Sequence, residues 1–308
     1  MHGPSEVKVE MDMAAPDAER VLGKKFDVEI THPGVIFGEG PVWDTRTKHL
    51  YYTDICGNTI WKWKPGGKPE TIMSPSNMAN GMQTDAQGRL VVCGWGGRTI
   101  FRLDTDGSSF TTLMTEWEGK KLNSPNDIAI KSDGSIWFTD PPGGLLNVGM
   151  VGQDLQKYHD VQPVYRISPD GKERSIITTD FVYPNGLCFS PDEKILYVNC
   201  SRERLIRAYD VNPDGKSVGP GRVFFQYTHP DKGNPDGLKC DVDGRVYCTA
   251  PGGIWVHNPD GSVVARLATP GTHATNICFG DDDHKTMYIT MIGCVSRIRL
   301  NTPGVASK

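Results

Sequence analysis

Short stretches in which apolar and polar residues alternate recur along the whole chain, and most of them end in a turn. Segments such as ILYVNC, RVYCTA and TMYITMI are rich in aromatic and β-branched residues, which favour strands. Asp-Gly pairs occur between such segments at 106–107, 133–134, 170–171, 214–215, 243–244 and 260–261. These pairs indicate hairpin turns, because glycine readily adopts the positive φ that such turns require. Helix signals are almost absent, so the pattern predicts an all-β protein.

The predicted strands fall into six similar units. Each unit begins with a short polar residue, and the intervals between these residues are 41, 46, 59, 51 and 40 positions. The introducing residues are Glu39, Asn80, Asn126, Asn185, Asp236 and Asn276. In the first unit we expect strands at 41–43, 50–53, 59–64 and 70–73. A repeat of this length with strands and turns in every unit is typical of a β-propeller. We therefore predict a six-bladed propeller with four-stranded blades.

The last unit lacks its outer strand. The segment 25–31 (KFDVEIT), which precedes the first unit, alternates like a strand and can complete the sixth blade. Closure of the ring in this way protects a sheet edge that would otherwise stay open. The sequence therefore predicts one propeller domain over 25–303, an N-terminal extension over 1–24 and a C-terminal tail over 304–308.

One segment departs from the repeat. Residues 141–163 separate the second and third strands of the third unit and are too long for a hairpin. Long insertions in compact domains are often functional, so this segment either borders the active site as a lid or reflects simple variation in length.

Composition and charge narrow the choice of partner. The net charge of −4 and the absence of a basic run argue against nucleic acid, and no apolar stretch is long enough to span a membrane. The N-terminus lacks the apolar core of a signal peptide. The eight cysteines form no C-x-x-C pair and indicate buried thiols in a reducing compartment. We expect a cytoplasmic monomer or homodimer that acts on a small molecule.

Equivalent positions of a propeller meet at its central axis, so the introducing residues are candidates for a site. Glu39, Asn126, Asn185 and Asp236 would bring two carboxylates and two amide carbonyls together. A proline precedes the last three of these residues, and proline fixes the backbone geometry at its own position. Oxygen ligands of this kind suit a hard cation, above all Ca²⁺, with Mg²⁺, Mn²⁺ or Zn²⁺ as alternatives.

The assignment of Asp236 rests on its position. Its motif, Asn-Pro-Asp-Gly, also occurs at 212–215 and 258–261, where it lies between the outer strands of a blade and indicates a turn. At 234–237 the same motif precedes the first strand of a unit, as Asn-Gly does at 80–81 and 185–186. We therefore interpret Asp236 as a ligand rather than as a turn residue.

Several further residues have two interpretations. Asn80 and Asn276 complete the ring, where they either support the ligands or contact substrate. His273 either reaches the channel mouth and moves protons or lies on a solvated loop. The aromatic residues Trp95, Trp117 and Tyr183 either line a pocket or pack in the core. The acids Asp54 and Asp140 end the second strands of their units and are expected to cap loops.

Four motifs together identify a family resemblance: GEGPVW at 38–43, SPNDI at 124–128, YPNGL at 183–187 and PDG at 235–237. From about residue 26 to 303 the chain resembles the gluconolactonases, senescence marker protein and luciferin-regenerating enzyme. Diisopropylfluorophosphatase and the paraoxonases are more distant six-bladed relatives. In that family the Glu, Asn, Asn and Asp that match Glu39, Asn126, Asn185 and Asp236 hold a catalytic divalent cation. The resemblance therefore implies a metal-dependent hydrolase, most often a lactonase.

The chain also departs from relatives at two positions. Animal sugar lactonases have an arginine that contacts substrate where this chain has Ser124. Paraoxonases have an acid after the first metal ligand that helps to hold a second calcium, and this chain has Gly40 there, although Asp127 matches the other half of that site. We therefore do not expect a second calcium.

These observations lead to a functional hypothesis. The cation would polarise the carbonyl of a lactone and activate water, with Asp236 as general base or, less readily, as nucleophile, and with Glu39 as the other catalytic carboxylate. Asn80, Asn126, Asn276 and His273 would contact the substrate. Hydrolysis of phosphotriesters or other esters at the same site, and a non-catalytic calcium-binding scaffold, are the alternatives.

Overall fold

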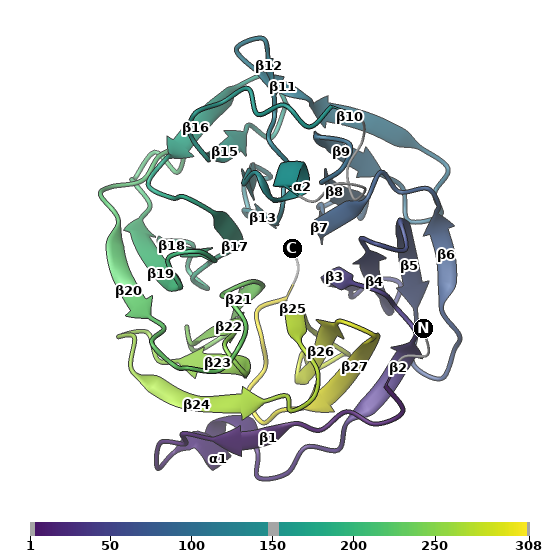
Figure 1. Ribbon diagram of the computed structural model, residues 1–308, viewed down its shortest axis with the longest axis vertical. Helices are drawn as coiled ribbons and strands as arrows, with labels where there is room; N and C mark the ends of the chain where they lie inside the picture. The colour runs from purple at the N-terminus through teal and green to yellow at the C-terminus, as the bar shows by residue number, and fades with distance from the viewer. Residues whose placement is uncertain (1–3, 147–153, 307–308) are drawn as a thin grey trace.

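The computed structural model describes residues 4–146 and 154–306, and it confirms the six-bladed propeller. Six antiparallel sheets surround a central axis, each with its first strand innermost (Figure 1). From the innermost strand outward, blade one is β3 (Gly38–Asp44), β4 (His49–Asp54), β5 (Thr59–Trp63) and β6 (Glu70–Met73), and blade two is β7 (Ala79–Thr84), β8 (Leu90–Gly94), β9 (Thr99–Leu103) and β10 (Phe110–Met114). Blade three is β13 (Ile128–Ile130), β14 (Ile136–Thr139), β15 (Val164–Ile167) and β16 (Arg174–Thr178), and blade four is β17 (Pro184–Phe189), β18 (Ile195–Cys200), β19 (Leu205–Asp210) and β20 (Arg222–Gln226). Blade five is β21 (Leu238–Cys240), β22 (Val246–Ala250), β23 (Gly253–His257) and β24 (Val263–Ala268), and blade six is β25 (Ala274–Gly280), β26 (Thr286–Met291), β27 (Cys294–Arg299) and β2 (Glu29–Pro33).

The N-terminal strand closes the ring as expected. β2 pairs antiparallel with β27, with Glu29 opposite Arg297, and supplies the outer strand of blade six. The strand begins four residues later than the alternating segment 25–31, while Phe26 and Val28 of that segment pack against the core instead. Across the closing interface, the ring of Trp43 in blade one stacks on Tyr288 in blade six at 5.4 Å.

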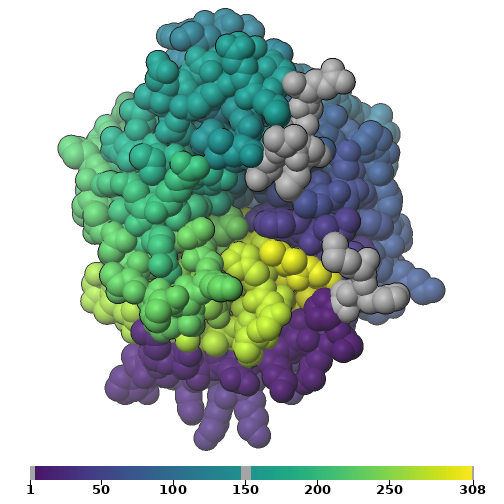
Figure 2. Space-filling model, viewed as in Figure 1, coloured from purple at the N-terminus to yellow at the C-terminus, as the bar shows by residue number. Residues whose placement is uncertain are grey.

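Both terminal segments that the sequence places outside the propeller are attached to it. The short strand β1 (Glu10–Asp12) pairs with β24 at the outer edge of blade five, and Arg266 donates hydrogen bonds of 2.8 and 2.6 Å to Asp12. Helix α1 (Ala18–Leu22) follows, and both elements lie along the outer rim, as the purple segment in Figures 1 and 2 shows. At the other end, the amide of Val305 donates to the carbonyl of Cys240 on β21 at 3.0 Å.

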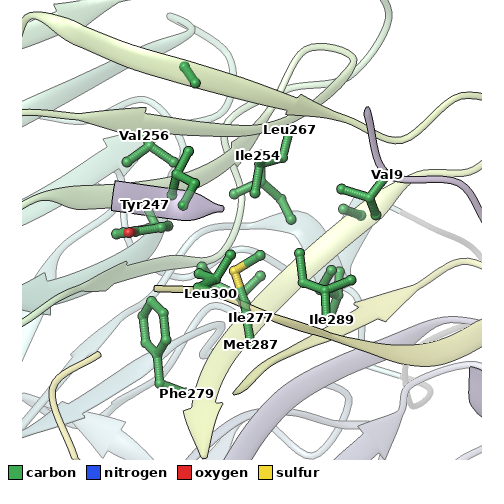
Figure 3. Close-up of a cluster of buried hydrophobic side chains, with 14 of the residues drawn as sticks. Val9, Tyr247, Ile254, Val256, Leu267, Ile277, Phe279, Met287, Ile289 and Leu300 are labelled. Carbon is green, nitrogen blue, oxygen red and sulfur yellow. The ribbon is translucent and has the colours of Figure 1, made fainter. Parts of the chain in front are cut away.

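The core lies between neighbouring blades. Figure 3 shows this packing for blades five and six, where Tyr247 and Ile254 face Ile277 and Ile289. All four side chains are fully removed from solvent. Burial of a side chain of this size stabilises the folded state by about 1.5–3 kcal/mol, so each interface between blades contributes substantially to stability.

Two smaller elements interrupt the repeat. A hairpin of β11 (Glu116–Trp117) and β12 (Lys120–Lys121) extends from the outer edge of blade two, and Trp117 packs there against Tyr165 at a ring distance of 5.7 Å. Trp117 therefore belongs to the core packing. Helix α2 (Gly143–Leu146) begins the predicted insertion over 141–163, of which residues 147–153 lie outside the described part.

The cysteines follow the prediction with one exception. Seven are buried, whereas Cys56 is exposed in the loop between β4 and β5, so its assignment as a buried thiol was wrong. A tight turn after Asp54 leaves Cys56 outside the regular strand, where alternation no longer buries it. All eight are free thiols. Among the described residues, no helix has both the length and the apolar character needed to cross a membrane.

Candidate functional site

The six introducing residues lie at one end of the inner strands, where hydrogen bonds connect every blade to the next. In every case the acceptor is a backbone carbonyl. Around the ring, the donors and the residues whose carbonyls accept are Thr53 Oγ1 to Asn80 (3.1 Å), Gly81 N to Asn126 (2.8 Å), Thr139 Oγ1 to Asn185 (2.7 Å), Gly186 N to Asp236 (3.1 Å), Gly237 N to Thr275 (2.8 Å) and Thr275 Oγ1 to Gly38. Residues far apart in sequence therefore come together at one channel mouth, as the repeat predicts.

The strand pairing is irregular at several of these residues. The register shifts at Glu39–Val42, Ala79–Met82, Pro184–Leu187 and Ala274–Asn276, which is the start of the inner strand in four blades. A bulge of this kind redirects a side chain and bends the strand. Glycine is also required where the inner strands begin, because neighbouring blades approach closely there. A Cβ at Gly237 would lie 2.2 Å from Asn276 Oδ1, and one at Gly81 would lie 2.5 Å from Asp127 Oδ1.

Glu39 is sealed inside the mouth with 3% of its surface exposed. One carboxylate oxygen accepts hydrogen bonds from the Gly40 amide and from Asn276 Nδ2, both at 2.9 Å. Burial raises the pKa of Glu39 to about 7, because desolvation penalises the charged form more than these two hydrogen bonds favour it. The charge of Asp127 raises the pKa further, and that of Lys239 lowers it.

Asp236 is partly buried, so some of its surface remains accessible to solvent. Burial, and then the negative charges of Glu39 and Asp127, raise the pKa of Asp236 well above its usual range. Its backbone is fixed from both sides, because its amide donates to Thr249 at 2.9 Å and its carbonyl accepts from Asn199 Nδ2. Two neighbouring carboxylates that disfavour each other's ionisation would be stabilised by a bound cation.

The amides supply oxygens without partners. Asn185 Nδ2 donates to Ser201 Oγ at 3.0 Å, and Ser201 in turn donates to the carbonyl of Pro235 at 2.7 Å. This chain of bonds fixes the amide so that Asn185 Oδ1 is left buried with no hydrogen-bond partner, and Asn80 Oδ1 is in the same condition. Asn126 is also buried, at 8% exposure. A buried oxygen without a donor is costly unless a cation or water meets it.

The residues at the mouth therefore fit a divalent cation of the hard type. The donor set is Glu39, Asn126, Asn185 and Asp236, all of them oxygen ligands. Within residues 4–146 and 154–306, no group of three or more His, Cys, Asp and Glu side chains is arranged to hold a metal. A cation at this mouth would thus depend on amide oxygens as much as on carboxylates, a combination that suits Ca²⁺ better than Zn²⁺.

An open cavity of about 330 Å³ adjoins Asp236. Its lining includes Tyr183, Asn185, Arg202 and His273. Burial lowers the pKa of His273, so its imidazole is neutral at physiological pH. The guanidinium of Arg202 lies 5.6 Å from the ring centre of Tyr183, in cation–π contact. His273 and Tyr183 therefore both line the cavity beside Asp236.

The insertion borders the same end of the ring. A Cβ at Gly143 in α2 would lie 2.0 Å from the Tyr183 hydroxyl and 3.5 Å from Trp95, so the helix packs directly on these aromatic rings. Beyond the segment that is not described, the buried Arg98 donates to the carbonyls of Asp154 and Gln156 at 3.2 and 2.9 Å. Both described ends of the insertion are thereby attached near the mouth.

The two acids expected to cap loops do so. Asp54 accepts hydrogen bonds from the amides of Ile36, Phe37 and Gly57, and Asp140 accepts one from the amide of Asn123. Asn276 is engaged on both sides, since its Nδ2 donates to Glu39 and its Oδ1 accepts from the Ile277 amide at 2.9 Å. This arrangement favours a supporting role for Asn276 over contact with substrate.

Sequence reasoning missed Lys239 and Arg202. Lys239 lies between the buried Leu238 and Cys240, so alternation marks it only as a polar position in a strand. Arg202 lies in the turn that follows β18, where a charged residue usually indicates nothing more than exposure. The signal that could have found Lys239 is its place in the inner strand, three residues after Asp236.

Comparison with known proteins agrees with this geometry. The family model described as the SMP-30/Gluconolactonase/LRE-like region matches residues 37–293. The chain belongs to this family. A gluconolactonase of Zymomonas mobilis is 30% identical, over 94% of this chain and 86% of that protein. A 6-deoxy-6-sulfogluconolactonase of Pseudomonas putida is 26% identical, over 90% of this chain and 95% of its own length. A solved structure of a gluconolactonase from Xanthomonas campestris superposes with a TM-score of 0.87 at 32% identity and covers 97% of both chains.

Proposed function

We propose that the protein hydrolyses lactones and depends on a divalent cation, most favourably Ca²⁺, held by Glu39, Asn126, Asn185 and Asp236. The observation that carries the proposal is the convergence of two mutually opposed carboxylates and a partnerless amide oxygen at one channel mouth. The relatives named above, which are lactonases by name, support lactones as the substrate class. When bound, such a cation supplies Lewis-acid chemistry, because it polarises the lactone carbonyl and makes water more acidic.

The two carboxylates have different surroundings and therefore different tasks. Glu39 is enclosed and accepts hydrogen bonds from Gly40 and Asn276, so its position is fixed. Asp236 faces the cavity, where a water molecule beside a bound lactone can reach it. Asp236 therefore acts as the general base that removes a proton from the attacking water. Attack opens the ring when the bond between the carbonyl carbon and the ring oxygen breaks, and that oxygen takes up a proton.

The cavity walls would orient the lactone. Tyr183 offers an aromatic face and a hydroxyl, and Arg202, held against that face, offers hydrogen-bond donors at the rim. The neutral His273 lines the same cavity as Asp236 and would exchange protons with the departing ring oxygen. Position 124 is serine rather than arginine, but the pocket still has a guanidinium group, which Arg202 of blade four supplies.

A hydrolysis assay with a pH indicator tests the proposal. Purified protein is chelated, assayed on sugar, aliphatic and aromatic lactones, and assayed again after calcium is restored. We expect activity to disappear on chelation, to return with calcium, and to fall at least 100-fold in Asp236→Asn. A matched control is Asp243→Asn, which changes an exposed acid in the turn after β21 and is expected to leave activity unchanged.

The same assay separates the alternatives. Phosphotriesters and simple esters are run beside the lactones, and faster turnover of either would replace lactones as the substrate class. Calcium that raises the unfolding temperature without any turnover on the whole panel would instead support a non-catalytic scaffold. Activity that survives both chelation and Asp236→Asn would contradict the proposed mechanism.

A further inference from the structure

A lysine side chain lies inside the channel, directly beneath the carboxylates of the mouth. Lys239 belongs to the inner strand of blade five, and its side chain is 20% exposed. Its ammonium group lies 3.7 Å from Asp127 Oδ2 of blade three and donates to Asn276 Oδ1 of blade six at 3.5 Å. It also donates to the carbonyl of Leu238 at 3.0 Å. The ammonium therefore connects three blades across the axis.

The oxygens around this ammonium are those that a hard cation would use. They comprise a carboxylate from Asp127, an amide oxygen from Asn276 and a backbone carbonyl from Leu238. Asp127 is 97% removed from solvent, and apart from the ion pair with Lys239 its Oδ2 has no hydrogen-bond partner. Such an atom requires a nearby positive charge. Lys239 is the cation that the structure provides for it.

Charge balance points to the same conclusion. The carboxylates whose charges act on one another at the mouth are Glu39, Asp127 and Asp236. A bound divalent cation would favour the ionised form of all three, and one such cation together with one ammonium then balances their charge. Lys239 also lines a cavity of about 80 Å³ toward the other end of the channel, with Leu187 and Val305, so its stem fills the space below the mouth.

We infer that Lys239 is a built-in substitute for a second cation, and that it limits the channel to one divalent ion. This inference rests on the proposed function for the first ion but concerns a different position, between Asp127 and Asn276. It also assigns a positioning role to Lys239, because Asn276 uses one end of its amide to meet Lys239 and the other to hold Glu39.

The test is a calorimetric calcium titration of chelated protein, together with metal analysis after dialysis. Lys239→Ala removes the ammonium and opens its space, so it is expected to bind one calcium more per chain than the wild type. Lys131→Ala is the matched control, since Lys131 is a buried lysine that follows the end of β13 in blade three and pairs with Asp133 at 3.9 Å. This control is expected to bind the wild-type number.

The difference between Lys239→Ala and wild type tests this inference, while the number bound by wild type tests the proposed function. A wild-type number of zero contradicts the proposed metal site, and an unchanged number in Lys239→Ala overturns the role given to Lys239. Should Lys239→Ala fail to fold, Lys239→Met keeps the stem and removes only the charge. Calcium is then expected to raise its unfolding temperature more than that of wild type, and an equal or smaller rise overturns the inference.

Discussion

The replacement Glu39→Gln probes whether the mouth lacks positive charge. The substitution preserves the shape of the side chain, and its amide oxygen can still accept from the Gly40 amide and from Asn276. It removes the negative charge that burial and Asp127 make costly. In protein freed of divalent cations, Glu39→Gln is therefore expected to be more stable than wild type above neutral pH.

The magnitude follows from the two pKa values. Glu39 titrates at about 7 in the folded protein, compared with 4.5 in the absence of structure. At about 1.4 kcal/mol per pH unit, this difference corresponds to about 3 kcal/mol. Because the folded state binds the proton more tightly, this stability is present below pH 4.5 and is lost as pH rises through 7. Asp236 titrates together with Glu39, so relief of its pKa adds to the effect.

The assay is equilibrium unfolding in urea, followed by tryptophan fluorescence, at pH 5 and pH 8 with a chelator present. Wild type is expected to lose about 2.5 kcal/mol more than Glu39→Gln between these pH values, because part of the effect lies below pH 5. Glu116→Gln, which changes an exposed glutamate on the rim, is expected to behave like wild type. Calcium at pH 8 should restore wild type and have much less effect on Glu39→Gln. Equal pH dependence in the two proteins would refute the reasoning.

Three further changes test other parts of the structure. Gly237→Ala places a Cβ 2.2 Å from Asn276 Oδ1, so we expect a loss of about 1–3 kcal/mol in stability and weaker calcium binding by titration; wild-type affinity would contradict the packing at the mouth. Burial lowers the pKa of His257 to about 3, so wild type should lose up to about 1.4 kcal/mol per pH unit below pH 6.5 relative to His257→Gln; parallel unfolding curves would disprove this. Arg266→Met removes two hydrogen bonds to Asp12, and trypsin should then cleave the segment before residue 25 faster; unchanged cleavage would show that β1 is held by other contacts.

The repeat made most of the fold predictable. The outer strand of the first blade lies at Glu70–Met73, the range that alternation indicates, because strands and hairpin turns are specified locally. The closing strand could be predicted because the sixth unit was one strand short. Strand β1 could not, because three residues carry no periodic signal and their pairing depends on the exposed edge of β24.

The candidate site shows the same division. Position in the repeat places Glu39 and Asp236 at one mouth, since equivalent positions of a propeller share a location. Contacts across the axis are not specified by any local pattern, so the bond from Asn276 to Glu39 and the ion pair between Lys239 and Asp127 became evident only in the folded structure. In the sequence, the glycines at the start of the inner strands were the only indication of the bulges there.

Diffraction from crystals grown in calcium, with anomalous differences measured after exchange into manganese, tests the central claim most directly. We predict a single peak at the channel mouth, with Ca²⁺ at about 2.3–2.6 Å from oxygens of Glu39, Asn126, Asn185 and Asp236. An empty mouth at saturating calcium, or a peak bound by other residues, would contradict the account.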